Sequence, residues 1–274
     1  MRIKDILKNE ISRDTIIIDA ENVKNYYWES DKNNYTIKDF PNISPPFEDF
    51  FIDLGTSKYK EGNVSIEIMS SFHCIESFKE GSNLKMGFKI CTMSNTEPRS
   101  MFLTPGELII KDRDVCFMRL FNSVPLSENI QNINTVNKIN KMSQEDRQDL
   151  IKNALHMGML TISFMNCKNT TLIENNPCDN LTRQQKRMME RKNIEPEKKY
   201  YILDIEPMKK ILRKEGNIEE NGFKKALHIC RGHFRDYSKG NGLFGKFKGL
   251  YWVDMHTKGN KANGEIIKDY NILV

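Results

Sequence analysis

Long hydrophobic runs are missing from this sequence of 274 residues. No segment approaches the roughly 18–20 consecutive apolar residues that a membrane-spanning helix needs, so we expect no membrane span and no membrane partner. The first residues, MRIKDILKNEISRD, are charged and lack the apolar stretch of a secretory signal, which predicts a cytoplasmic protein. Aromatic residues nevertheless make up 9% of the chain and hydrophobic residues 38%, which excludes a wholly disordered chain.

Closely spaced cysteines are also absent. None of the six cysteines falls in a Cys-x-x-Cys or Cys-x-Cys pair, and none alternates with histidines at the spacing of a zinc finger. We therefore expect reduced, mostly buried thiols and no metal site. Glu48, Asp49 and Asp53 form an acidic cluster, but no spaced partner completes the pattern of a metal-dependent nuclease. We interpret these three residues as surface or strand-end acids.

Several catalytic signatures are missing as well. The sequence has no Gly-x-Ser-x-Gly elbow and no His-Glu-x-x-His motif. The glycine-rich segment 240–245 lacks the Gly-Lys-Ser/Thr ending of a nucleotide-binding loop. We therefore predict no cofactor.

Positive charge is concentrated in the last third of the chain. Residues 1–180 contain 21 basic and 25 acidic side chains, whereas residues 181–274 contain 21 basic and 12 acidic ones. Such an imbalance is typical of a surface that binds nucleic acid or another polyanion. The alternative is a solvated face that lysines keep soluble, and charge alone leaves both open.

The first two thirds of the chain read mainly as β-structure. Apolar and polar residues alternate in 63–69 and 83–91, which is the period of half-buried, antiparallel strands. The charged turn 111–114 between two apolar segments predicts a hairpin. We therefore expect an α+β protein with an antiparallel, β-rich region, 1–180, and a basic, antiparallel C-terminal sheet module, 181–274. The two regions can also pack as one unit.

Other segments predict a mixture of loops and helices. The asparagine-rich stretch 127–142 indicates a loop, and Ser143 is a good N-cap for a helix that ends near His156. The alternation in 160–164 predicts a further strand, and 166–182 reads as a boundary. Residues 183–192 predict a basic helix with charges on more than one face. It is either a solvated connection or an arm that follows phosphates.

The candidate site lies near the C-terminus. If the segment 224–237 is a strand, then Arg231, His233, Arg235 and Tyr237 project from one face, because successive side chains alternate. The next strand would place Trp252, Asp254 and His256 on a common face, with Lys246 and Lys248 in the turn between. The apolar residues also fit helical spacing, and a helix would scatter the polar groups around its axis.

This row is suited to metal-independent cleavage of RNA. One imidazole would remove a proton from a ribose hydroxyl and the other would protonate the leaving oxygen, with His233 and His256 as the pair. Arg231, Arg235 and Lys246 would stabilise charge on the phosphate. The alternative is that these histidines are structural residues in hydrogen bonds, and that the row only binds.

The segments 226–237, 243–246 and 249–252, together with His256, resemble an uncharacterised family of phage and bacterial mobile-element proteins. The resemblance covers about the last third of the chain. It implies a viral or mobile-element setting and no particular chemistry. We therefore expect the basic C-terminal face to bind nucleic acid, RNA or DNA. The alternative is a non-enzymatic phage accessory or inhibitor protein that binds a host protein.

Overall fold

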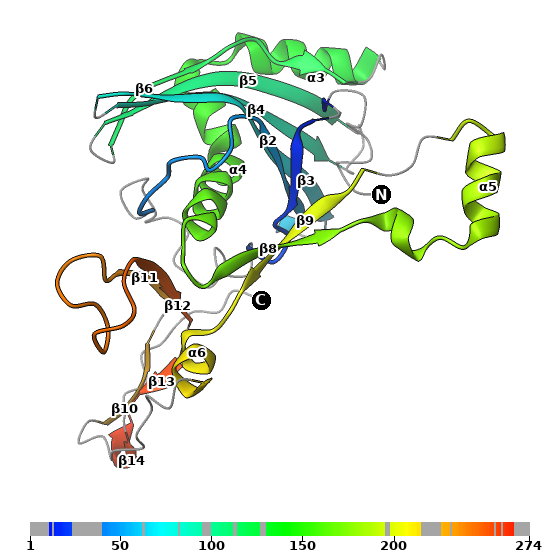
Figure 1. Cartoon of the computed structure of the whole chain (residues 1–274). Helices are drawn as coiled ribbons and strands as arrows, with labels where there is room; N and C mark the ends of the chain where they lie inside the picture. Colours follow the sequence, from blue (N-terminus) through cyan, green and yellow to red (C-terminus); the bar gives the residue numbers. More distant parts are fainter. Residues whose placement is uncertain are drawn as a thin grey trace.

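A large sheet with a helix across one face forms the body of the protein, and two small sheets follow it (Figure 1). The computed structural model describes residues 11–12, 14–23, 40–61, 64–81, 83–94, 100–111, 114–126, 130–194, 198–214, 226–230, 232–254, 256–258 and 260–265. This arrangement confirms the α+β class.

The large sheet has the strand order β6-β5-β4-β3-β2-β1-β9-β8, and β7 pairs with β5. Its members are β1 (Ile16–Asp19), β2 (Phe50–Glu61), β3 (Val64–Glu80), β4 (Asn83–Ser94), β5 (Ser100–Lys111), β6 (Asp114–Leu120), β7 (Val124–Pro125), β8 (Thr170–Asn175) and β9 (Tyr200–Ile205). Strands β2 to β6 form an antiparallel meander, as the alternation predicts, and β5 and β6 form the predicted hairpin. Strand β1 is parallel to both β2 and β9, so the complete sheet is mixed.

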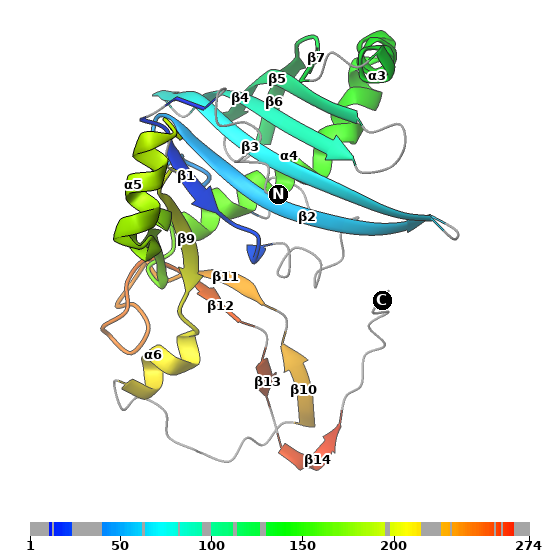
Figure 2. The same cartoon turned by 90° about the vertical axis from the view of Figure 1, so that its right-hand side faces the viewer.

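The core lies between the sheet and α4 (Gln144–Met165), which crosses one sheet face (Figure 2). Alternation places Leu84, Met86, Phe88 and Ile90 on that face, and all four are buried. Gly158 allows a close approach, because a Cβ atom there would lie 2.6 Å from Cγ of Phe72.

Helix α4 continues past its predicted end, so the strand predicted over 160–164 is wrong. Every residue from Ala154 to Phe164 is buried, because this half of the helix is covered on all sides. A fully buried helix has a continuous apolar sequence, and short stretches of such a sequence also fit the period of a strand.

The segment predicted as a loop contains a second helix, α3 (Ile130–Lys141), and its asparagines explain the error. The Asn132 amide donates to the Met101 carbonyl and accepts from the Met101 N–H, both at 2.9 Å. Asn140 makes the same pair of bonds with Ser123, and Gln144 with Leu120. These amides satisfy backbone groups at the sheet edge much as another strand would, which a sequence pattern does not reveal.

The predicted division at residue 180 lies between two paired strands of one sheet, because β8 precedes it and β9 follows it. The segment that reads as a boundary, 166–182, therefore contains a strand. A short helical turn, η3 (Pro177–Asn180), and the predicted basic helix, α5 (Arg183–Arg191), connect β8 to β9. Residues 208–214, for which the sequence predicts one or two helical turns, form α6 (Met208–Lys214).

The C-terminal residues form two small sheets. One contains β13 (His256–Lys258), β10 (Ala226–Cys230) and β14 (Asn260–Glu265), and the other contains β11 (His233–Asp236) and β12 (Leu250–Val253). The β10–β13 and β11–β12 pairs are antiparallel, as predicted, whereas β14 is parallel to β10. Residues 266–272, whose sequence also predicts a strand, lie outside the described residues. Among the helices in the described ranges, none has the length and apolarity to cross a membrane.

The acidic cluster has a structural role at the start of β2. Asp49 accepts a hydrogen bond from the Thr15 hydroxyl at 2.7 Å, and its other oxygen lies 2.8 Å from Nε2 of His73. Asp53 is 2% exposed and lies within β2, so its assignment to the surface or a strand end is wrong. Within the described ranges, no group of three or more potential ligands could hold a metal ion.

The buried imidazole of His73 predicts a loss of stability in acid. Burial lowers the pKa of His73, and this outweighs the opposite effect of Asp49. The pKa of His73 is lower in the folded state than in the unfolded state. The neutral imidazole therefore contributes its full stabilisation above the unfolded-state pKa of about 6.5, and this stabilisation is lost as the pH falls below it. We expect the urea concentration at the unfolding midpoint to be lower at pH 5.5 than at pH 7.5, and this difference to be smaller in His73→Gln than in the wild type. Equal falls in both proteins would contradict this prediction.

Candidate functional site

The candidate segment is extended and forms one arm of a long, interrupted hairpin. Cys230 pairs with His256 in one small sheet, and His233 pairs with Val253 in the other, so both ladders have the same register. The strand interpretation is therefore confirmed over 226–230 and 233–236, and the helical alternative is excluded there. We use "the hairpin" below for residues 232–254.

One face of the hairpin packs against the end of α4. The rings of Phe234 and Trp252 lie 5.2 and 4.9 Å from the ring of Phe164 and 4.8 Å from each other, measured between centroids. Gly232 lies against the indole, because a Cβ atom there would lie 2.6 Å from Cζ2 of Trp252. This aromatic cluster joins the hairpin to the core of the body.

Hydrogen bonds complete this attachment. The buried Asn169 amide accepts from the Trp252 N–H at 3.0 Å and donates to the carbonyls of Trp252 and Glu206 at 2.9 and 2.8 Å. The Lys168 N–H donates to the Leu250 carbonyl at 2.8 Å. The predicted common face of Trp252 and Asp254 is confirmed, since the indole N–H donates to the Asp254 carboxylate at 2.8 Å. The inner face of the hairpin is thus held in one position.

The outer face carries part of the predicted row. Phe234 points inward, so His233 and Arg235 project from the opposite face, and both side chains are exposed. The Arg235 guanidinium lies 5.2 Å from the centroid of the Tyr237 ring, within the range of a cation–π contact. Tyr237 in turn packs edge-on against Tyr251 at 5.9 Å. Arg231 lies outside the described residues.

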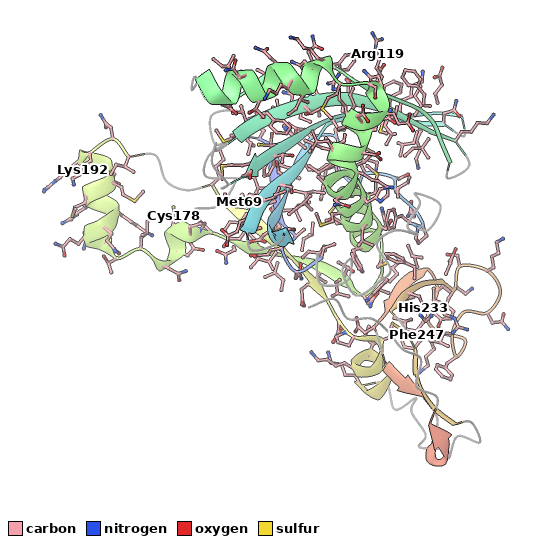
Figure 3. All side chains as sticks on the ribbon, turned by 180° about the vertical axis from the view of Figure 1, so that it is seen from behind. Met69, Arg119, Cys178, Lys192, His233 and Phe247 are labelled. Atoms are coloured by element: carbon pink, nitrogen blue, oxygen red, sulfur yellow. The ribbon has the colours of Figure 1, made fainter. Side chains whose placement is uncertain are left out.

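The tip of the hairpin adds exposed cations and an exposed ring. Lys239, Lys246 and Lys248 are all exposed there. Phe244 has a positive φ of 52° and is 57% exposed, which is unusual for a bulky side chain. Figure 3 shows His233 and Phe247 together on the hairpin, away from the large sheet. In the sequence Phe244 interleaves with lysines, a pattern that fits either base stacking or the core face of a strand, and its exposure excludes the core face.

The two proposed catalytic histidines do not lie opposite each other along the backbone. His233 pairs with Val253, whereas His256 pairs with Cys230, three residue pairs away. At about 3.4 Å per residue this is a separation of about 10 Å along the ladder. The side chain of His256 lies outside the described residues, so the acid–base pair stays a prediction.

Three of the four described thiols are unsuited to nucleophilic chemistry. Cys74, Cys91 and Cys167 are buried, and burial raises the pKa of each to about 12. A thiol with this pKa is un-ionised at neutral pH, and the thiolate is the reactive form. The prediction of reduced and mostly buried cysteines is confirmed for the cysteines that the structure describes.

Comparisons of the chain with protein-family models, with curated proteins and with solved structures find no match.

Proposed function

We propose that the hairpin binds nucleic acid, RNA or DNA, through the phosphate backbone. The observation that carries this proposal is the contrast between its two faces. The inner face is packed on α4, whereas the outer face and tip present Arg235, Lys239, Lys246 and Lys248 to solvent. A rigid support reduces the entropy that these cations lose when they meet a row of phosphates.

Aromatic side chains among these cations favour nucleic acid over other polyanions. The guanidinium of Arg235 stacks on Tyr237, and Phe244 presents an exposed ring beside the lysines of the tip. Sites that bind single-stranded nucleic acid combine a positive groove with rings on which bases stack. An acidic protein surface would supply the charge but no flat bases. The observations therefore favour nucleic acid over the host-protein alternative.

Cleavage of RNA is not part of this proposal. It requires two imidazoles on either side of one phosphate, and the backbone register places His233 and His256 three pairs apart. Binding requires only the exposed cations.

Removing three hairpin cations is expected to weaken binding of a single-stranded RNA or DNA 20-mer more than tenfold. The variant is Arg235→Gln/Lys239→Gln/Lys248→Gln. Because each phosphate contact on a single strand contributes about 0.7 to the slope of log K against log salt, the slope should fall by about 2. Fluorescence anisotropy between 50 and 200 mM KCl measures both quantities for each nucleic acid.

The matched control is Lys138→Gln/Lys141→Gln/Lys152→Gln, which removes the same charge from exposed positions on α3 and α4. We expect this control to change the affinity less than twofold. If both variants lose the same affinity, the loss is explained by the lower net charge alone, and the proposal is contradicted. Binding that is absent, or that does not change with salt, would favour a protein partner.

A further inference from the structure

Helix α5 is a second charged surface, and it lies apart from the hairpin. It belongs to residues 176–199, which connect the far ends of β8 and β9. The β8–β9 ladder begins at Thr170, next to Asn169, whose amide holds the hairpin. From Thr170 to Asn175, where the connection begins, it is about 17 Å long at about 3.4 Å per residue. Figure 1 shows α5 standing away from the small sheets, and Figure 3 shows Lys192 on the opposite side of the molecule from His233.

Local bonds define α5, and no other part of the described chain buries any of its residues. Thr182 and Gln185 form a capping box at its start, with bonds of 2.8 and 3.3 Å between side chain and backbone. No residue of the helix is buried. An isolated helix of this length is marginal in water, and most helices gain their stability by packing. A partner that docks on α5 would supply the packing that it lacks.

The charges within α5 lie on one side, whereas Lys192, which the predicted segment also included, is the C-cap residue beyond the helix. At about 100° per residue, all five charged side chains fall within an arc of about 140°. Arg183, Arg187 and Arg191 follow one another at intervals of four residues, about 6 Å per step. Lys186 extends this row, and Glu190 is the one acid on the face. Met188 and Met189 lie on the other side.

The arginines of this row are available to a partner. All three are exposed, and none forms an ion pair with another residue of the described ranges. Arginine carries its charge at any physiological pH and binds phosphate with a planar fork of donors. A row of such groups at regular intervals is complementary to the regularly spaced phosphates of a rigid double helix.

We propose that α5 is a binding site for duplex DNA, which its arginine row contacts through phosphates. Residues 183–191 contain no aromatic ring for the stacking of unpaired bases, which argues against a single strand. The major groove of B-form DNA admits a helix, whereas that of A-form RNA is too narrow. This proposal takes only the class of partner from the proposed function, since its residues lie outside the hairpin.

The test is the affinity for a 30-base-pair DNA duplex of mixed sequence, measured by anisotropy between 50 and 200 mM KCl. In Arg183→Gln/Arg187→Gln/Arg191→Gln we expect more than a tenfold loss of affinity. The salt slope should fall by about 2 to 3, since each contact with B-form DNA contributes about 0.9. Glutamine preserves helix propensity, and the row is exposed, so the thermal midpoint should not change.

The control is again Lys138→Gln/Lys141→Gln/Lys152→Gln, which should change the affinity less than twofold. A second variant, Arg183→Lys/Arg187→Lys/Arg191→Lys, should retain most of the salt slope because it retains the charge. If the arginine variant matches the control, the α5 proposal is overturned, whatever the hairpin variant does. If the arginine variant loses duplex binding and the hairpin variant keeps its full affinity for the single-stranded 20-mer, the α5 site stands and the proposed function fails.

Two other outcomes would also overturn the α5 proposal. One is wild-type protein that does not bind the duplex. The other is an arginine row that is required for a single-stranded 30-mer or for vesicles containing phosphatidylserine, but not for the duplex.

Discussion

Replacing Trp252 with alanine is expected to destabilise the protein by about 3–5 kcal/mol, the usual cost of truncating a buried aromatic side chain. Trp252 is 4% exposed and contacts Phe164 and Phe234, so its loss leaves a cavity between the hairpin and α4. Urea unfolding followed by circular dichroism measures the change. Hydrogen exchange of the hairpin amides then shows whether the hairpin detaches before the body unfolds.

The control for this variant is Phe244→Ala, at an exposed position on the same hairpin. It removes a ring of similar size that is not buried, and we expect a change within about 0.5 kcal/mol. A loss below about 1 kcal/mol in Trp252→Ala would show that the aromatic cluster does not hold the hairpin.

The second large effect is expected at Asn169, which is 4% exposed. Leucine has a similar volume but would leave the Trp252 N–H and the carbonyls of Trp252 and Glu206 without their partner. Each buried polar group left unsatisfied costs about 1–3 kcal/mol, so we expect Asn169→Leu to lose about 3 kcal/mol or more. Urea unfolding at pH 7 measures the loss, and Asn180→Leu at an exposed position is the control.

Asn169→Asp separates the donor role of this side chain from its acceptor role. An ionised carboxylate can still accept from the Trp252 N–H, but it faces two carbonyl oxygens and has no proton to donate. Burial beside these oxygens should raise the pKa of the introduced carboxyl, so its protonated form is favoured in the folded state. The deficit relative to wild type should therefore shrink as the pH falls from 7 to 5. A deficit that does not depend on pH would contradict the donor role.

Structural elements whose sequence pattern depends only on neighbouring residues were predictable from the sequence. The alternation in β3 and β4, the turn between β5 and β6 and the cap at Ser143 all appear where the pattern places them. The row on β11 follows from the same period of two, since one face must pack when the other is polar.

Other features depended on contacts between distant residues. The asparagines of α3 read as a loop because this residue type favours turns, and only the sheet edge that they satisfy makes the helix stable. The buried end of α4 reads as a strand, because an apolar run has no period that separates the two structures. The hydrogen bonds of Asn169 have no local signal in the sequence, because the partner residues Glu206 and Trp252 lie far along the chain.

The amino-acid pattern alone thus determined the α+β class, the meander, the extended candidate segment and the excess of positive charge after residue 180. These properties depend on neighbours in the chain, whose spacing is fixed by covalent geometry. Tertiary structure decided which face of the hairpin is covered, how far α4 extends, and that the described part of the chain leaves α5 without a buried residue. Each of these depends on which surfaces meet, and burial is a property of the folded chain as a whole.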